Sequence, residues 1–310
     1  MNILVTGAAG YIGSILTPRL LAAGHRVIAL DNYMYQQTSL LECCNNPAFQ
    51  AVRGDARNVE LLQKLLPQAD AIIPLACLTG APLCSRDPVG AQTVIVDAVR
   101  EILKRRSPRQ TIVYPTTNSG YGVGEKGKFC TEETPLRPIS LYGRLKAEIE
   151  QALLDAGQAI TLRLATVFGA SPRMRTDLLV NDFVLRAVRD RYVVLFEADF
   201  KRNYLHVRDA ADAFAYCLEN FERMKNEPYN VGLSEANISK RELCVEIQQQ
   251  VKDFNFSESP VGEDPDKRDY IVSNAKIEKA GFKARRTLAE GIAELIKAFE
   301  ILPKSPFGNV

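Results

Sequence analysis

The sequence predicts an α/β fold with a doubly wound parallel sheet in its first half and a smaller mixed α/β domain in its second. Two observations carry this prediction. Short apolar runs alternate with amphipathic stretches over the first half of the 310 residues, which is typical of strand–helix–strand units. The runs are apolar nearly throughout, as expected for strands covered by helices on both faces.

The elements of the first half follow in alternating order. The predicted strands are Asn2–Thr6, Arg26–Leu30, Phe49–Arg53, Ala69–Pro74, Thr111–Tyr114 and Ile160–Leu164. The predicted helices between them are Tyr11–Ala23, Ser39–Cys44, Val59–Leu66, Pro88–Arg106 and Ile139–Ala156. Residues 1–168 are therefore predicted to form the first domain.

The alternation breaks near Gly169, where a turn-rich segment begins. The pattern beyond it predicts helices at Asp177–Arg189, Arg208–Phe221, Lys240–Val251 and Leu288–Glu300, and strands at Val193–Phe196 and Asn203–Val207. We expect residues 169–310 to form the second domain, with residues 204–221 returning to the first. Residues 303–310 are expected to fray.

Composition excludes several classes of protein. Lysine and arginine total 39 against 37 acidic residues, a net charge of +2, which gives no global field for nucleic acid or an anionic membrane. The first residues do not resemble a signal peptide, and no apolar stretch reaches the roughly 18 residues needed to cross a bilayer. Seven scattered cysteines and two histidines form no metal-binding pattern. We therefore expect a cytoplasmic protein with free thiols and no metal.

A glycine-rich turn joins the first predicted strand to the first predicted helix. It reads Thr6-Gly7-Ala8-Ala9-Gly10-Tyr11-Ile12-Gly13. Glycines at this spacing let the backbone turn tightly and approach a pyrophosphate, whose charge the helix N-terminus favours. In this position the turn predicts the dinucleotide site of a Rossmann-type fold.

Asp31 ends the second predicted strand, 18 residues after Gly13. A carboxylate there accepts hydrogen bonds from the ribose hydroxyls and repels a 2′-phosphate, and residues 32–38 contain no arginine or lysine to bind one. This favours NAD over NADP. The alternative is a solvated turn aspartate.

Two further strand ends are candidates for the same site. Asp55 and Ala56 follow the third predicted strand, where an adenine edge would lie, and Leu75 and Ala76 follow the fourth, beside a nicotinamide. In both places a plain turn or a packed strand end is the alternative reading.

Tyr142 and Lys146 lie four residues apart in the helix predicted over Ile139–Ala156. This spacing puts a phenol and an ammonium on one helical face. The ammonium and a nicotinamide cation both stabilise the phenolate, which can then act as a base near neutral pH.

Thr117 lies in Thr116-Thr117-Asn118-Ser119-Gly120-Tyr121-Gly122, at the end of the fifth predicted strand. Ligands bind at the carboxyl ends of strands in open α/β sheets, so its hydroxyl can hydrogen-bond a substrate oxygen. Turn formation is the competing interpretation, because Thr, Asn, Ser and Gly all favour turns.

The glycine turn, Asp31, the Thr-Thr-x-x-x-Tyr-Gly stretch and the Tyr142/Lys146 pair, in this order, resemble the extended short-chain dehydrogenase/reductase family, and within it the NAD-dependent sugar-nucleotide epimerases and dehydratases. The second half resembles it too, in the stretches at 168–175, 202–209 and 266–270. The resemblance implies Tyr142 as base, Lys146 as its activator and Thr117 as the catalytic hydroxyl. It also implies a homodimer through the helices near 90–106 and 140–156.

The remaining implied roles concern two ligands. The resemblance implies that NAD is held by Gly7, Gly10, Tyr11, Ile12, Gly13, Asp31, Asn32, Asp55, Ala56, Leu75, Ala76, Tyr142 and Lys146. It implies that the sugar nucleotide contacts Thr117, Asn118, Ser119, Arg173, Asn181, Arg202 and Arg268. The segment from Arg163 to Arg208 holds eight arginines and one lysine against five acids, a local excess of basic charge suited to a diphosphate.

Three stretches are similar to a narrower subgroup from bacterial capsule and lipopolysaccharide clusters, which oxidises GDP-linked heptose at C4. They are Pro82-Leu83-Cys84, Thr117 to Gly122, and Gly262 to Tyr270. The dehydratases of the family carry Asp-Glu directly after the catalytic threonine, where this chain has Asn118-Ser119, so dehydration is not expected. Three hypotheses stay open: a GDP-heptose 4-dehydrogenase, a UDP- or GDP-hexose 4-epimerase, and a non-catalytic NAD-binding sensor.

For one histidine and two cysteines near the predicted site, the sequence favours a structural role over a catalytic one. His206 lies in an apolar predicted strand, which favours a hydrogen-bonded structural histidine. Cys77 and Cys84 have no base placed to activate them, so we expect small packing residues.

Overall fold

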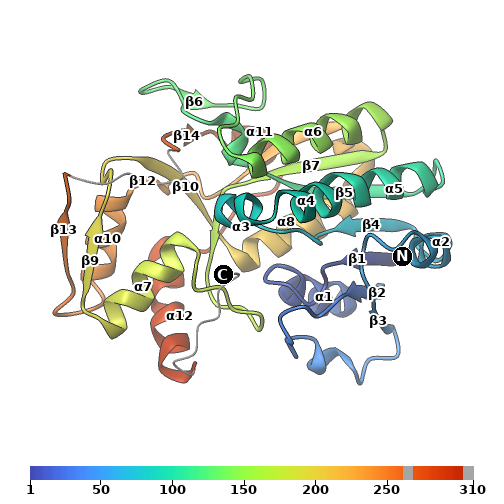
Figure 1. The fold of residues 1–310 in the computed structure, drawn as a ribbon, viewed down its shortest axis with the longest axis horizontal. Coiled ribbons are helices and arrows are strands. Elements are labelled where there is room, and N and C mark those ends of the chain that lie inside the picture. The colour runs from blue at the N-terminus through green and yellow to red at the C-terminus, as the bar shows by residue number, and fades with distance from the viewer. Residues whose placement is uncertain (261–267, 303–310) are drawn as a thin grey trace.

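The computed structural model describes residues 1–260 and 268–302. Its main sheet has seven strands in the order β11-β7-β5-β4-β1-β2-β3, and every neighbouring pair is parallel. The strands are β1 (Asn2–Thr6), β2 (Arg26–Asp31), β3 (Phe49–Arg53), β4 (Ala71–Pro74), β5 (Thr111–Thr117), β7 (Ala159–Leu164) and β11 (Glu227–Val231). This confirms the predicted doubly wound α/β fold (Figure 1).

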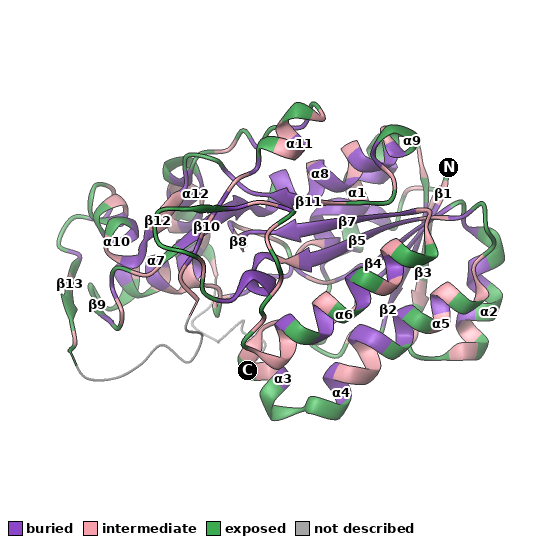
Figure 2. Cartoon of the chain, turned by 90° about the horizontal axis from the view of Figure 1, so that it is seen from above, coloured by how far each residue is buried: buried purple, intermediate pink, exposed green. Residues whose placement is uncertain are grey.

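Helices cover both faces of this sheet because its strands are apolar on both sides. Ile3 and Val5 of β1 join one apolar core and Leu4 the other. One face carries α1 (Gly13–Ala22) and α8 (Val207–Glu219); the other carries α2 (Val59–Leu65), α4 (Pro88–Gln92), α5 (Ala98–Arg105) and α6 (Leu141–Ala156). Figure 2 shows the central strands almost wholly buried between these layers.

The smaller part of the molecule contains three small sheets and several helices. The sheets pair β8 (Thr166–Phe168) and β12 (Asn237–Ser239) with β10 (Lys201–His206), β9 (Tyr192–Leu195) with β13 (Asn255–Glu258), and β6 (Phe129–Cys130) with β14 (Ile271–Val272). The helices of this part are α7 (Leu179–Arg189), α10 (Lys240–Gln248) and α12 (Leu288–Ile301), whereas α9 (Phe221–Met224) packs beside α8 and α11 (Ala275–Lys279) beside β11 of the main sheet.

Some elements differ from the sequence prediction. The helix predicted over Ser39–Cys44 is only the single 3₁₀ turn η1 (Leu41–Cys43). The helix predicted over Pro88–Arg106 is interrupted by the π-helical turn η3 (Thr93–Asp97), where four β-branched residues in succession crowd an α-helical turn. A short helix, α3 (Ala81–Arg86), was not predicted.

Two segments beyond residue 168 return to the main sheet. Helix α8 packs against α1, within the range 204–221 for which a return was expected. Strand β11 also returns, as the edge partner of β7. The predicted second domain thus contributes both a covering helix and an edge strand to the first.

Sequence-encoded caps fix the helices that carry site residues. The Ser140 hydroxyl accepts a hydrogen bond from the Gly143 amide at 3.1 Å and starts α6 just before Tyr142. Gly157, with a φ of 70°, ends the same helix. In the described ranges we find neither a helix long and apolar enough to span a bilayer nor a cluster of residues fit to hold a metal ion.

Candidate active site

The glycine turn after β1 is packed so closely that no side chain fits. A Cβ atom on Gly7, whose φ is 67°, would lie 2.6 Å from the Ala76 amide nitrogen. A Cβ on Gly13 would lie 2.5 Å from the Ala8 carbonyl oxygen. The turn therefore presents bare backbone at the start of α1, which is the cradle a dinucleotide pyrophosphate requires.

Asp31 lies buried beside this turn, at the end of β2. Its carboxylate accepts hydrogen bonds from the amides of Ala9 at 3.0 Å and Tyr33 at 2.8 Å, and from the Gln37 side chain at 3.2 Å. Burial raises the pKa of Asp31 above its ordinary value, and these hydrogen bonds oppose that rise. A carboxylate has about four acceptor positions, so one remains for a ribose hydroxyl.

Asp55, at the end of β3, is paired with a residue that sequence reasoning missed. Its Oδ2 lies 2.7 Å from Nη2 of Arg57, and its Oδ1 accepts from Nε of the same guanidinium at 2.9 Å. This hydrogen bonding, against the opposing effect of burial, lowers the pKa of Asp55. The adenine end of the predicted site therefore offers an ionised carboxylate held by arginine.

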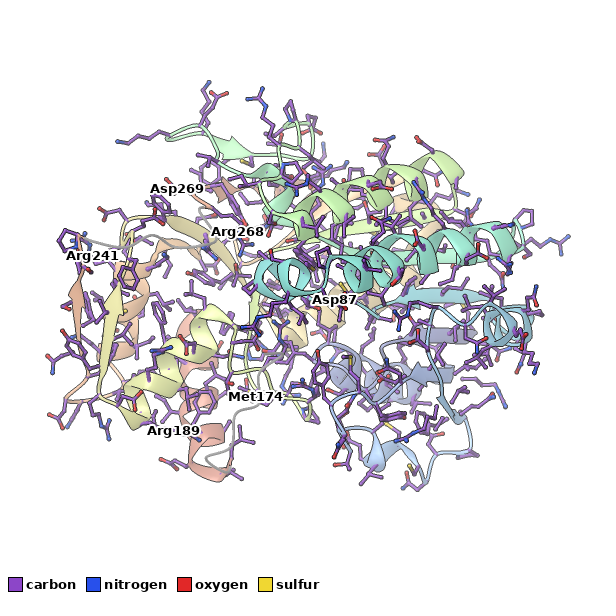
Figure 3. The ribbon with its side chains drawn as sticks, in the orientation of Figure 1. Asp87, Met174, Arg189, Arg241, Arg268 and Asp269 are labelled. Atoms are coloured by element: carbon purple, nitrogen blue, oxygen red, sulfur yellow. The ribbon has the colours of Figure 1, made fainter. Side chains whose placement is uncertain are left out.

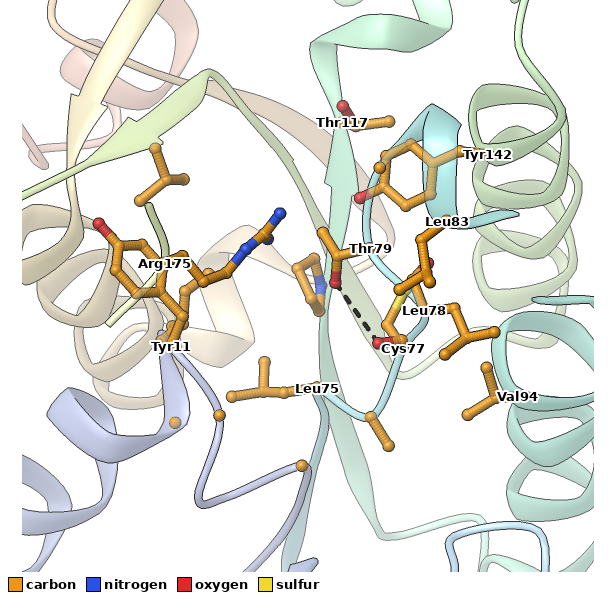
Figure 4. A pocket seen from close by; sticks show the side chains of 18 of the residues that line it. Tyr11, Leu75, Cys77, Leu78, Thr79, Leu83, Val94, Thr117, Tyr142 and Arg175 are labelled. Carbon is orange, nitrogen blue, oxygen red and sulfur yellow. Dashed lines mark hydrogen bonds between the residues drawn. The ribbon is translucent and has the colours of Figure 1, made fainter. Parts of the chain in front are cut away.

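A single cavity of about 620 Å³ connects the predicted cofactor and catalytic residues. The predicted residues that line it are Gly7, Gly10, Tyr11, Ile12, Gly13, Asp31, Asn32, Asp55, Ala56, Leu75, Ala76, Thr117, Ser119, Tyr142, Lys146, Arg173, Arg202 and Arg268. Figure 4 shows Thr117 and Tyr142 on one side of this cavity and Tyr11 and Arg175 on another. The carboxyl ends of β1, β2, β4 and β5 meet there.

Tyr142 and Lys146 occupy one face of α6, as their spacing predicts. The Lys146 ammonium is buried and donates hydrogen bonds to the Tyr114 hydroxyl and the Pro115 carbonyl oxygen, each at 2.9 Å. Burial raises the pKa of Tyr142 well above its ordinary value, and the positive charge of Lys146 opposes this rise. The lysine thus lowers the pKa of Tyr142, as expected. The sequence did not reveal that burial of the phenol raises this pKa.

Thr117 caps the 3₁₀ turn η4 (Asn118–Tyr121) that follows β5. Its hydroxyl donates to the Ser119 hydroxyl at 2.9 Å and accepts from the Ser119 amide at 3.1 Å. Arg268 donates from Nη1 to the same Ser119 hydroxyl. Figure 3 shows Arg268 and Asp269 in the C-terminal half, where the Asp269 carboxylate accepts from the Lys201 amide of β10 at 2.8 Å.

Two predicted substrate contacts, Asn118 and Asn181, are not among the residues that line the cavity. The Asn181 amide is buried: its oxygen accepts from the Gly169 amide at 3.0 Å, and its nitrogen donates to the Arg175 carbonyl at 2.8 Å and to the Tyr11 hydroxyl at 3.2 Å. Asn181 therefore joins the glycine turn to the segment after β8. Asn118 is 1% exposed, and its amide has no hydrogen-bond partner in the described part of the chain.

The arginine-rich segment reaches the cavity with more side chains than were predicted. Arg173 stacks over the Tyr35 ring, with its guanidinium carbon 4.3 Å from the ring centre. Arg175, paired with Asp177, also lines the cavity. Arg173 was named by the family resemblance, whereas the excess of basic residues in this segment was the signal for Arg175 and did not specify that it faces the cavity.

Three remaining expectations have different outcomes. His206 is buried, with Nε2 2.5 Å from a Glu294 carboxylate oxygen and Nδ1 accepting from the Arg208 amide, as expected of a structural histidine. Cys84 is buried, whereas Cys77 lines the cavity. The part of the Gly262-to-Tyr270 stretch from 262 to 267 lies outside the described residues.

The fold and the cavity together define a dinucleotide-binding protein of the Rossmann class. The model of the NAD dependent epimerase/dehydratase family matches residues 3–232. The chain belongs to this family. Its cofactor is accordingly NAD, which the bare glycine turn and the free acceptor position of Asp31 fit.

Individual relatives cover nearly the whole chain. UDP-glucuronic acid decarboxylase 1 of Arabidopsis thaliana is 24% identical over 96% of this chain and 70% of its own length. The low-salt glycan biosynthesis protein Agl12 of Haloferax volcanii is 27% identical over 94% of this chain and 96% of its own. The structure of Thermus thermophilus UDP-glucose 4-epimerase with NAD has a TM-score of 0.82 and 26% identity, covering 97% and 99% of the two chains.

Proposed function

We propose that this protein oxidises C4 of a nucleotide-linked sugar to a 4-keto group, and that its substrate is GDP-D-glycero-D-manno-heptose. The observation that carries this proposal is the meeting of Tyr142, Lys146 and Thr117 with the cofactor residues Leu75 and Ala76 in one cavity. A base and a hydride acceptor on the same sugar carbon are the two requirements of alcohol oxidation.

The chain's residues divide the proton chemistry between them. The Tyr142 phenolate takes the proton of the C4 hydroxyl, Lys146 stabilises that phenolate, and the Thr117 hydroxyl hydrogen-bonds the same sugar oxygen. When bound, NAD⁺ accepts the hydride, so the C4–H electron pair leaves the sugar and C4 becomes a carbonyl carbon. The buried ammonium of Lys146 favours the phenolate at the moment when the proton has to move.

The residues after Thr117 argue against elimination of water. Asn118 and Ser119 stand where the family's dehydratases carry Asp-Glu. An amide and a hydroxyl do not exchange protons near neutral pH as a carboxyl group does. Chemistry that stops at the 4-keto sugar, or returns the hydride, needs no further acid or base.

The choice of sugar nucleotide rests on the surroundings of the cavity. Arg202 and Arg268 line it and supply planar, charged donors for a diphosphate. Pro82 and Leu83, from one of the stretches similar to the GDP-heptose enzymes, line it as well.

A UDP- or GDP-hexose 4-epimerase is the second candidate. It uses the same residues but returns the hydride to the other face of the keto sugar. The Thermus thermophilus structure at 26% identity, which is titled a UDP-glucose 4-epimerase, favours this candidate. A non-catalytic NAD-binding sensor is the third, and the intact Tyr142/Lys146 pair inside the cavity argues against it.

Product analysis separates these candidates. Purified protein is incubated with NAD and, in separate reactions, GDP-heptose, GDP-mannose or UDP-glucose, and the sugar nucleotide is examined by mass spectrometry and NMR. We expect GDP-heptose to lose two hydrogens and gain a 4-keto signal. An unchanged mass with inverted C4 stereochemistry would establish the epimerase, and tight NAD binding without turnover of any sugar would favour the sensor.

We also propose a cytoplasmic homodimer that pairs through the helices at 90–106 and 140–156. All seven cysteines are free thiols, which suits a reducing compartment. Helices α5 and α6 pack side by side on one face of the sheet and offer a helical surface to a second copy. Light scattering during size-exclusion chromatography measures the mass in solution and would contradict this proposal if it gave a monomer.

A further inference from the structure

Tyr114 is a buried phenol beside the catalytic pair to which the proposed mechanism gives no role. It lies in the middle of β5, three residues before Thr117, and is 1% exposed. A polar side chain inside an apolar strand costs free energy unless it finds a partner. Its partner here is the Lys146 ammonium, whose Nζ donates to the Tyr114 hydroxyl at 2.9 Å.

The contact has two parts. Besides the hydrogen bond, Nζ of Lys146 lies 4.3 Å from the centre of the Tyr114 ring, a distance at which the ring face attracts a cation. The Pro115 carbonyl oxygen accepts a second hydrogen bond from Nζ at 2.9 Å. An ammonium has three donors, so two are committed to β5 and one remains to point into the cavity.

A second bond fastens α6 to β5 one helical turn further on. The Thr116 hydroxyl donates to the Glu150 carboxylate at 2.7 Å, and Glu150 is paired with Arg163 of β7 at 2.7 Å. Helix α6 therefore cannot slide along β5. The hydrogen bond from Lys146 to Tyr114 is separate from the Thr116–Glu150 bond. Loss of the Tyr114 hydroxyl should therefore change the position of the ammonium while α6 stays in place.

We propose that Tyr114 is a positioning residue that directs the Lys146 ammonium at the Tyr142 phenol and the cofactor. This inference rests on the proposed function, in which Lys146 stabilises the Tyr142 phenolate. Without the Tyr114 hydroxyl, the buried ammonium loses one of its two acceptors on β5, is held less firmly in place, and stabilises the Tyr142 phenolate less. The base then ionises at a higher pH.

The charged and titratable groups that face Tyr142 come from three elements. They are Lys146 on α6, Tyr114 on β5, and Cys77 and Cys84 from the segment between β4 and the end of α3. Lys146 alone among them is a cation, so a change in its position dominates the electrostatic change at Tyr142.

Tyr114→Phe tests the proposal, because it removes only the hydroxyl and keeps the ring. The matched control is Tyr216→Phe: Tyr216 of α8 also accepts a hydrogen bond from a cation, Arg223, with the guanidinium carbon 5.5 Å from its ring centre, and it does not line the cavity. Two readouts are taken on each protein: NAD affinity by calorimetry, which needs no sugar, and the pH profile of kcat with the sugar nucleotide that turns over.

We expect Tyr114→Phe to weaken NAD binding about fivefold to tenfold and to displace the acidic limb of the kcat profile upward by about one pH unit. Activity then recovers at high pH. Tyr216→Phe changes neither quantity. The proposal is wrong if Tyr114→Phe keeps the wild-type affinity and profile, or if its activity falls equally at every pH.

A second variant guards against a folding defect in Tyr114→Phe. 3-Fluorotyrosine, installed at position 114 by amber suppression, keeps the shape and hydroxyl but weakens the oxygen as an acceptor and the ring as a cation partner. It should move both readouts in the same direction by a smaller amount, and unchanged values would overturn the proposal. The measurement of NAD affinity separates failure of this proposal from failure of the proposed function, because NAD binding can be measured even if the protein turns over no sugar nucleotide.

Discussion

At the scale of single residues, Tyr142 is the group on which the proposed chemistry depends most. Its phenol lines the cavity, and burial raises its pKa against the opposing charge of Lys146. Burial by the surrounding protein thus makes this phenol resist ionisation. A positive nicotinamide ring is the additional charge that would make it a base.

Replacing Tyr142 by Phe should lower kcat by about 10² to 10⁴, the range typical of a lost general base. The Phe side chain fits the same space, so folding and NAD binding should be nearly unchanged. Single-turnover kinetics with the active sugar nucleotide measures the effect. Full turnover by Tyr142→Phe would show that the base has been assigned incorrectly.

Asp31→Ala should weaken NAD binding about tenfold to a hundredfold, because it removes charged acceptors for the ribose hydroxyls. It should also reduce the preference for NAD over NADP, since the repelling carboxylate is gone. Calorimetric titration with both cofactors checks this. Asp155→Ala, an exposed change on α6, is the control, and equal affinities for Asp31→Ala and wild type would refute the role.

The sequence revealed these residues but not all their surroundings. Gly7, Asp31 and Tyr142 are recognisable because each stands at a defined distance from a strand or helix end. Asn181 lies in a helix whose packing against Tyr11 depends on segments about 170 residues apart. Tyr114 lies within an apolar strand, where nothing in the local pattern marks it as the partner of a lysine.

At the scale of elements, the ion pair between Glu150 and Arg163 fixes α6 against the sheet. The two side chains are 4% and 7% exposed and lie 2.7 Å apart. Arg163 also donates to the Tyr121 hydroxyl at 3.0 Å and to the Glu132 carbonyl oxygen at 3.0 Å. Removal of one partner leaves an uncompensated buried charge.

Glu150→Gln should therefore lower the free energy of unfolding by about 3–5 kcal/mol. The matched control lies two residues earlier on the same helix: Glu148 pairs with Arg100 at the same 2.7 Å, but the side chains are 42% and 55% exposed. Glu148→Gln should cost less than about 1 kcal/mol. Urea unfolding of both variants measures these two free energies. Equal losses of free energy of unfolding would contradict a larger contribution from the buried pair.

Glu294 connects α12 to β10 through His206, and its contribution should depend on pH. Burial disfavours its ionisation, but the hydrogen bond and charge of His206, with the charge of Arg208, outweigh burial and lower the pKa of Glu294. A carboxyl with a lower pKa in the folded state stabilises the fold above its unfolded pKa. That stabilisation is lost as the pH falls through the folded value.

Glu294→Gln should thus cost about 1–2 kcal/mol at neutral pH and progressively less below about pH 4. Thermal or urea unfolding of variant and wild type across this range gives the difference at each pH. A difference that stays constant down to the lowest pH would show that the charge of Glu294 does not contribute.

Element prediction succeeded where the pattern was strong. The six strands β1 to β5 and β7 were predicted in place, and all but the edge strand β3 are largely apolar strands that helices cover. The strands β6, β8, β11, β12, β13 and β14 were not predicted; all but β11 have only two to four residues, which carry too little periodicity. The η3 turn was predicted as α-helix because its apolar side chains keep a helical spacing. Its backbone hydrogen bonds follow the π-helical pattern instead.

At the scale of the whole molecule, the two halves form one site. The main sheet and helix α6 supply the glycine turn and the proposed catalytic side chains, and the segment after β8 brings Arg173 and Arg175 to the same cavity. Tyr11, in the glycine turn, donates to the Gly169 carbonyl oxygen at 2.6 Å. The halves are thus hydrogen-bonded together where cofactor and sugar nucleotide would meet.

The most direct test of C4 oxidation is a single turnover with a nucleotide sugar that carries deuterium at C4. Protein loaded with NAD⁺ is mixed with deuterated GDP-heptose, quenched, and analysed by mass spectrometry and NMR. We predict that deuterium appears at C4 of the nicotinamide as the 4-keto sugar forms. Turnover that leaves all deuterium on the sugar would contradict net oxidation and favour the epimerase, and release of deuterium to water would contradict hydride transfer from C4.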